Sequence, residues 1–77
     1  MRYRFVVIFR EKHSGEYRFC TIKPDNTISH LYPPWEGLHF HSKHEAEAWW
    51  NIHGDSAVSV YAQSSGDEFY TKRLIQV

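Results

Sequence analysis

The sequence predicts a small α+β domain in which an antiparallel sheet of four to five strands is covered on one face by a single helix. Three observations lead to this fold class. Apolar and polar residues alternate near both ends of the chain, a helix-start signal with an apolar period of about 3.6 residues lies between them, and turn residues separate the segments. One helix among several short strands is typical of a two-layer sandwich, so we expect the order β-β-(β)-α-β-β.

Length and composition fit a single domain over residues 1–77. Of the 77 residues, 42% are hydrophobic and 23% are charged. A chain of this size buries about 60% of its surface on folding, which is enough for one core. The only cysteine excludes an internal disulfide, and no apolar run approaches the roughly 18 residues that cross a bilayer. We therefore expect a soluble, cytoplasmic domain that does not contact a membrane.

The N-terminal third predicts a β-hairpin. Residues 3–10 and 16–22 are rich in aromatic and β-branched residues, and Gly15 between them suits the positive φ of a short loop. We expect Phe9 to lie opposite Tyr17, a register that creates favourable cross-strand pairs. The predicted core face then holds Tyr3, Phe5, Val7, Phe9, Tyr17 and Phe19, and the predicted exposed face holds Val6, Ile8, Cys20 and Ile22.

A turn, a short strand and a loop follow the hairpin. Residues 23–26 predict a turn, because proline fixes φ and Asp and Asn tolerate the left-handed region, and residues 27–31 predict a third short strand. Two prolines exclude a helix or a central strand at 32–37. Trp35 in this loop has two interpretations, an aromatic lid folded over the edge of the core or a rigid contact for a partner.

The clearest local signal is a capping box at Ser42. Its Ser-x-x-Glu spacing lets the hydroxyl accept a hydrogen bond from the amide of Glu45, which starts a helix. Four residues then share one helical face, and Gly54 suits a left-handed stop. We expect a helix over about 42–53 whose apolar face consists of Ala46, Trp49, Trp50 and His53.

The end of the chain predicts a second hairpin. Residues 55–62 alternate with a period of two, residues 63–67 are rich in turn formers, and residues 68–77 have the composition of a final strand. The predicted sheet therefore has two hairpins, joined by the helix.

One helix leaves one face of the sheet uncovered. In the predicted register this face has an apolar centre, and large exposed apolar patches on proteins mark contact sites. Arginine is favoured at such interfaces, which makes the face a candidate for docking a protein partner or a second copy of the chain. The candidate partner-binding residues are Arg2, Arg4, Arg10, Arg18 and Trp35.

Charge is divided along the chain. Residues 1–23 contain six basic and two acidic side chains, and the remaining residues contain three basic and seven acidic ones, so a net charge of zero combines +4 with −4. This balance argues against a general polyanion binder but allows a local basic face. Arginines interleaved with aromatic residues on a sheet also occur in proteins that bind single-stranded nucleic acid, and that is the alternative function.

Few residues have a pattern that indicates catalysis or metal binding. The sequence has no nucleophile elbow, glycine-rich phosphate loop or pair of carboxylates at helical spacing, so we expect neither enzymatic activity nor a cofactor. His39, His41 and His44 form a His-x-His-x2-His pattern, and three converging imidazoles would bind Zn²⁺. No cysteine pair accompanies them. Surface histidines and a pH-responsive group of imidazoles are the other interpretations of this pattern.

In size, single-domain build and lack of catalytic motifs, the chain resembles the small inhibitors that phages and mobile elements encode, among them anti-CRISPR and other anti-defence proteins. The resemblance concerns overall build, and no residue is carried over from it. It implies a small non-enzymatic protein-binding module, an inhibitor or adaptor, that occludes a larger host complex.

Overall fold

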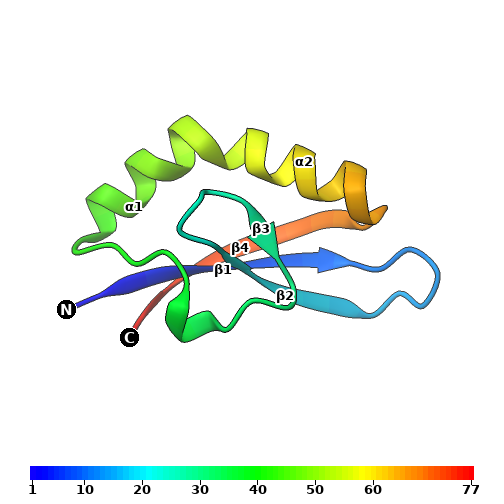
Figure 1. Cartoon of the computed structure of the whole chain (residues 1–77), viewed down its shortest axis with the longest axis horizontal. Helices are drawn as coiled ribbons and strands as arrows, with labels where there is room; N and C mark the ends of the chain where they lie inside the picture. Colours follow the sequence, from blue (N-terminus) through cyan, green and yellow to red (C-terminus); the bar gives the residue numbers. More distant parts are fainter.

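The computed structural model describes residues 1–77 as four strands and one long helical segment (Figure 1). The strands are β1 (Tyr3–Arg10), β2 (Tyr17–Ile22), β3 (Ile28–Ser29) and β4 (Glu68–Gln76). A 3-10 turn η1 (Pro34–Glu36) precedes α1 (Lys43–Trp49), a π-helical turn η2 (Trp50–Gly54) and α2 (Asp55–Ser65). All strand pairs are antiparallel, in the order β3-β2-β1-β4. The predicted α+β class, a four-stranded antiparallel sheet with one helix, is confirmed.

The helix begins where the sequence predicts. The Oγ of Ser42 accepts the backbone N–H of Glu45 at 3.1 Å. The carboxylate of Glu45 accepts the N–H of His41 at 3.2 Å, one residue earlier than a capping box predicts. On the predicted apolar face, Ala46 is buried, and the two tryptophans that follow are half-buried against the core.

The prediction that the helix stops at Gly54 and that a strand covers 55–62 is wrong. Gly54 has φ −59° and ψ −50°, which are helical values, and the chain continues directly into α2. This glycine permits close packing, because a Cβ at its position would lie 2.6 Å from ring atoms of Trp50. The alternation of 55–62 also fits a helix, since Ala57 and Tyr61 are four residues apart and both are buried. The observed order is therefore β-β-β-α-β.

The helix ends at Gly66 instead. This residue has φ 77°, in the left-handed region that favours glycine, and its N–H donates to the carbonyl of Ala62 at 2.9 Å. The chain then turns directly into β4, the final strand that the sequence predicts, which pairs with β1 instead of with residues 55–62.

The register of the first hairpin differs from the prediction by one residue. Tyr17 pairs with Arg10, whereas Phe9 was expected opposite it. The loop causes the shift: the N–H of Glu11 donates to the carbonyl of Glu16 at 2.8 Å, and the Glu11 carboxylate accepts two backbone amides of the loop. A shift of one residue exchanges the two faces of the strand.

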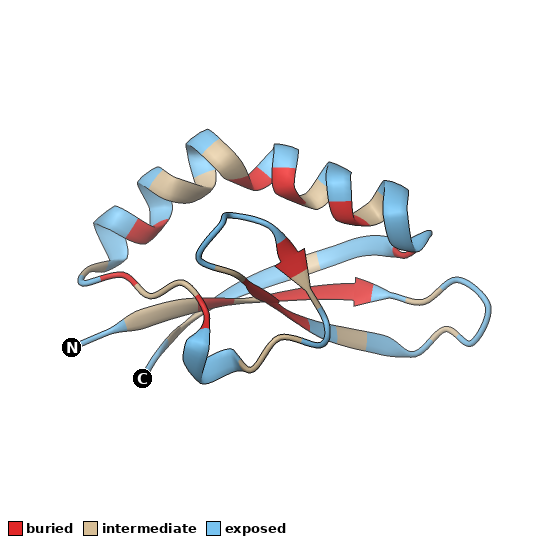
Figure 2. Ribbon diagram, in the orientation of Figure 1, coloured by how far each residue is buried: buried red, intermediate tan, exposed pale blue.

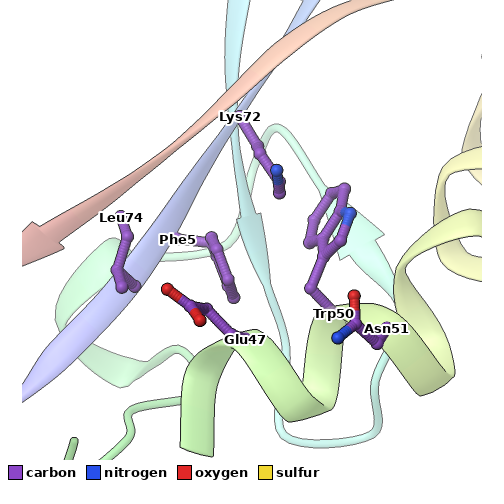
Figure 3. A pocket seen from close by; sticks show the side chains of 6 residues that line it. All are labelled: Phe5, Glu47, Trp50, Asn51, Lys72 and Leu74. Atoms are coloured by element: carbon purple, nitrogen blue, oxygen red, sulfur yellow. The ribbon is translucent and has the colours of Figure 1, made fainter. Parts of the chain in front are cut away.

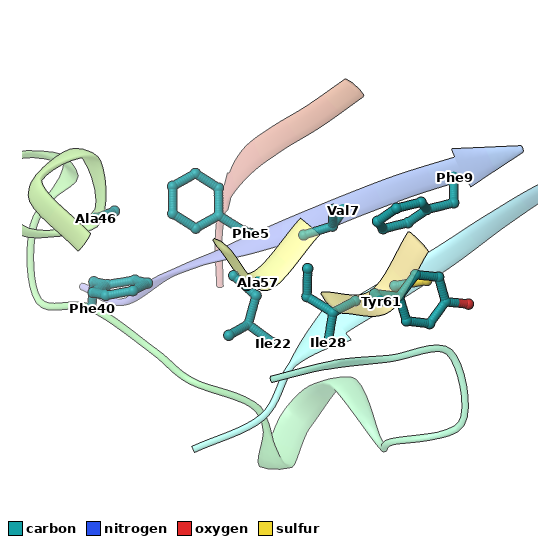
Figure 4. Close-up of a cluster of buried hydrophobic side chains, with 10 residues drawn as sticks. Phe5, Val7, Phe9, Ile22, Ile28, Phe40, Ala46, Ala57 and Tyr61 are labelled. Carbon is teal, nitrogen blue, oxygen red and sulfur yellow. The ribbon is translucent and has the colours of Figure 1, made fainter. Parts of the chain in front are cut away.

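The core lies between the helix and one face of the sheet (Figure 2). Phe5, Val7 and Phe9 of β1 belong to it, as predicted, but Cys20 and Ile22 of β2 join them in place of the expected aromatic residues. Figure 4 shows these strand side chains meeting those of the helix and of β3. The complete buried cluster is Phe5, Val7, Phe9, Cys20, Ile22, Ile28, Phe40, Ala46, Ala57 and Tyr61.

The outer surface of the helix is mixed, with the apolar side chains of Ile52 and Val60 exposed among polar and acidic ones. Glu45, Glu47 and Asp55 are exposed along it, and Lys43 at its start is the only lysine or arginine in residues 43–65. No helix of the chain combines the length and the apolar composition that crossing a membrane requires. The helix thus covers the core on one side and presents acidic side chains to solvent on the other.

Candidate binding face of the sheet

The face of the sheet turned away from the helix carries two of the five predicted binding residues, Arg4 and Arg10. Along β1 the even-numbered side chains lie on this side, opposite the buried odd-numbered ones. Cross-strand pairing aligns Ile8 with Phe19 and Val6 with Arg73. We name this surface the open face. It consists of Arg4, Val6, Ile8, Arg10, Tyr17, Phe19, Glu68, Tyr70, Thr71, Arg73 and Ile75.

A β-bulge brings Tyr70 onto the open face. The register of β4 against β1 shifts between Ile8 and Phe9, which leaves Tyr70 without a cross-strand partner. A bulge of this kind re-aims the side chain of the extra residue. The centroid of the Tyr70 ring consequently lies 4.9 Å from that of Tyr17.

Three aromatic side chains project from the open face. Phe19 is 66% exposed, Tyr70 57% and Tyr17 45%. Between them Ile8 is only 7% exposed, and together with Val6 and Arg73 these residues line a shallow hollow. A contiguous exposed apolar patch on a small domain marks a contact site.

The arginines of the open face have no carboxylate partner. The chain contains two ion pairs, and neither involves these residues. The guanidinium carbon of Arg10 lies 5.4 Å from the ring centroid of Tyr17, a cation–π contact, and its Nε–H donates to the carbonyl of Gly15 at 3.1 Å. The guanidinium groups of Arg4 and Arg73 are therefore available for carboxylates or phosphates of a ligand.

A second hollow adjoins the open face near the N-terminus. Trp35 on η1 is 76% exposed and lines this hollow together with Arg2 and Arg4, so it has the contact position and not that of a lid. The chain just after η1 packs closely against β2, because a Cβ at Gly37 would lie 2.4 Å from the Cγ2 atom of Thr21. The structure thus brings three of the predicted binding residues together.

Arg18 is the predicted binding residue that lies on the helix-covered side of the sheet, away from both the open face and the adjoining hollow. It pairs with Phe9 and therefore lies on the helix-covered side of β2. Its Nε is 3.3 Å from Oδ2 of Asp67, whose side chain is 6% exposed. This ion pair ties the hairpin to the residue that precedes β4, which is a structural role.

The prediction of binding residues missed the exposed aromatic side chains of the open face and one of its cations, namely Tyr17, Phe19, Tyr70 and Arg73. The first two were assigned to the core because of the one-residue error in register. One signal favoured the correct register: Cys20 and Ile22 share a face, and cysteine and isoleucine are among the residues most often fully buried. The position of Tyr70 depends on a bulge that no local pattern of residues indicates.

His39, His41 and His44 do not converge on a metal site. The structure contains no group of three or more His, Cys, Asp or Glu side chains that could hold a metal ion. The Nδ1–H of His39 donates to the carbonyl of Gly37 at 2.7 Å, and the other two histidines are exposed. This arrangement gives no support to the zinc hypothesis.

A polar cluster lies on the covered side, where α2 meets the sheet. The buried hydroxyl of Tyr61 donates to Oδ2 of Asp67 at 3.3 Å and lies 3.3 Å from Nδ1 of His30. Burial raises the pKa of Tyr61, and Cys20 and Asp67 raise it further. Burial also raises the pKa of Cys20, so the thiol stays protonated and is a poor nucleophile. The cluster joins the helix to the sheet and supplies no activated nucleophile.

No family model and no curated protein matches this chain. No solved structure matches it either. The fold and the site together define a small α+β domain with one helix-covered face and one aromatic, arginine-bearing open face. A function for the protein is therefore argued from this geometry.

Proposed function

We propose that the protein is a small non-enzymatic module, an inhibitor or adaptor, whose open face docks onto another protein. The observation that carries the proposal is the group of exposed aromatic rings around an apolar hollow, flanked by arginines without internal partners. Aromatic residues and arginine are enriched in protein interfaces and their hot spots, whereas lysine is depleted. None of the residues of the open face is lysine.

The charge of the open face indicates the chemistry of the partner. Arg4, Arg10 and Arg73 lie on it with one acidic residue, Glu68, which is opposite Arg10 in the strand register but forms no ion pair with it. A partner surface with carboxylates around an apolar centre would complement this arrangement. A second copy of the chain docked through the same face would bring like charges together, which disfavours a homodimer formed by this surface.

A capture experiment with two matched double variants tests the proposal. Arg4→Ala/Phe19→Ala removes one cation and one exposed apolar side chain from the open face, and Lys43→Ala/Val60→Ala removes the same two kinds of group from the helix surface. At about 200 mM salt, we expect the wild type and the helix variant to retain the same protein partner from cell lysate and the open-face variant to lose it by about tenfold or more. Equal retention by all three, or retention of no protein by the wild type, contradicts the proposal.

Single-stranded nucleic acid is the second candidate ligand, and the exposure of three aromatic rings beside arginines favours it. Bases stack on such rings while cations hold the phosphates. Affinity for a labelled oligonucleotide would then fall by orders of magnitude between about 50 and 200 mM salt, whereas binding across an apolar-centred protein interface would change little. A steep salt dependence, together with a loss of affinity in Phe19→Ala, would establish this alternative and displace the first proposal.

A further inference from the structure

The sheet has one long edge without a neighbour. β4 has nine residues and pairs only with β1. Outside that ladder, no backbone hydrogen bond involves residues 68–76, and one side-chain contact reaches their backbone, from Oγ1 of Thr71 to the carbonyl of Lys72 at 3.4 Å. The opposite edge strand, β3, has only two residues, and a short edge strand is one way in which proteins prevent further pairing. β4 instead presents a row of free N–H and C=O groups.

A groove lies between this edge strand and α1, as Figure 3 shows. Its volume is about 350 Å³, and its residues are Phe5, Glu47, Trp50, Asn51, Lys72 and Leu74. Three of them are apolar, and the Nζ atom of Lys72 lies 5.0 Å from the ring centroid of Trp50. Because side chains alternate along a strand, every second side chain of a strand added beside β4 would point to the groove side of the sheet.

The charges in the middle of the edge specify which segment fits. Lys72 and Arg73 are adjacent and exposed, lie on opposite sides of the sheet and have no ion-pair partner. Opposite charges on paired strands stabilise a sheet, and like charges directly opposite destabilise it. An antiparallel second copy of β4 centred on either residue would place that charge opposite itself. The complementary segment is therefore acidic.

We propose that β4 is a strand-addition site for an extended segment of a partner protein in which an apolar residue is next in sequence to an acidic one. The apolar side chain enters the groove beside Leu74 and Trp50. Its acidic neighbour points to the other side of the sheet, where it pairs with Arg73. Backbone hydrogen bonds to β4 supply affinity, and the groove and the charges supply specificity. This site shares Arg73 with the open face but includes none of its exposed aromatic rings, so the inference does not depend on docking through those rings.

Peptide selection followed by NMR tests this inference. A library of random peptides of about ten residues, the length of a long strand, is selected on the folded full chain. We expect the enriched peptides to share an apolar residue beside an acidic one and to raise the hydrogen-exchange protection of amides in residues 68–76 by about tenfold or more. Lys72→Glu/Arg73→Glu should weaken their binding by at least about tenfold, and Lys12→Glu/Lys43→Glu, with two exposed cations changed elsewhere, should not. Circular dichroism of both variants would check that they remain folded.

Four outcomes would overturn the inference. The first is a library without enrichment, and the second is peptides that bind while residues 68–76 remain unprotected. The third is protection of β4 that increases with protein concentration in the absence of peptide, because the edge then pairs with a second copy. Peptides that lose affinity for Arg4→Ala/Phe19→Ala but not for Lys72→Glu/Arg73→Glu bind the open face, a result that supports the proposed function and refutes strand addition.

Discussion

The two faces of β1 have similar local sequence but different surroundings. Phe5, Val7 and Phe9 are buried beneath the helix, whereas Val6 and Ile8 lie on the open face among arginines and exposed rings. Alternation along the strand separates the two sets. The residues that other elements bring to each side then decide which set becomes the core. On the covered side these are aliphatic, small and aromatic side chains of β2, β3 and the helix.

This difference shows where the stability of the fold resides. The covered face is closely packed, and its one arginine is paired with Asp67. The open face carries large exposed rings and unpaired arginines, which add little to folding and are suited to a partner. Matched substitutions on the two faces should therefore separate stability from binding.

The largest expected difference in stability comes from replacing one phenylalanine on each face by alanine. Phe9 is fully buried, so Phe9→Ala should lower the free energy of unfolding by about 3–5 kcal/mol, enough to leave much of a domain this small unfolded. Phe19 is 66% exposed, and Phe19→Ala should change stability by no more than about 1 kcal/mol. Urea unfolding followed by circular dichroism measures both. Equal losses would show that the open face also supports the fold.

A smaller loss of stability should come from disturbing the packing of the helix on the covered face. Gly54→Ala inserts a methyl group 2.6 Å from ring atoms of Trp50 and should cost about 1–3 kcal/mol, although alanine normally favours a helix over glycine by about 1 kcal/mol. Asn51→Ala, an exposed position in the same helical turn, should be neutral or slightly stabilising. Thermal unfolding compares the two variants. A more stable Gly54→Ala would mean that the ring moves aside without cost.

Much of the fold follows from local sequence. The alternation in β1, the start of the helix at Ser42 and the composition of β4 were sufficient to predict the fold class. The end of the helix was not predictable, because a glycine stop signal is local whereas the packing of Gly54 against Trp50 is tertiary. The strand predicted over 55–62 failed for the same reason, since small residues with a period of two can also present Ala57 and Tyr61 on one helical face.

The candidate site was only partly predictable. Arg4, Arg10 and Trp35 were identified because their prediction does not depend on the register between strands. The two arginines share a face of β1 through alternation along that strand, and Trp35 lies in a loop between two prolines and a glutamate. Tyr17 and Phe19 were assigned to the wrong face because the hydrogen bonds of Glu11 within its loop fix a register that strand composition does not specify. A site on a sheet therefore depends on the loops that set strand pairing.

Alkaline pH should weaken the covered face in particular. Burial raises the pKa of Tyr61 above its ordinary value of 10.0 and that of Cys20 above 9.0. As pH rises past these ordinary values, the unfolded chain loses protons that the folded chain keeps, so the free energy of unfolding falls. The contribution of both groups is complete below about pH 9 and is lost as pH rises towards their folded pKa values. Urea midpoints between about pH 7 and 11 measure this loss. A Cys20→Ala/Tyr61→Phe variant with the same pH dependence as the wild type would contradict it.

The smallest expected difference separates two arginines on opposite faces. Arg18→Ala leaves the buried carboxylate of Asp67 without its cation and should cost about 1 kcal/mol, a modest value because the Arg18 side chain is 39% exposed. Arg4→Ala breaks no ion pair within the chain and should change stability by less than about 0.5 kcal/mol while weakening partner binding. Adding Asp67→Asn to Arg18→Ala should recover part of the loss, since it removes the unpaired buried charge. If Arg4→Ala proves the more destabilising of the two, the arginines of the open face serve the fold and the division between the two faces does not hold.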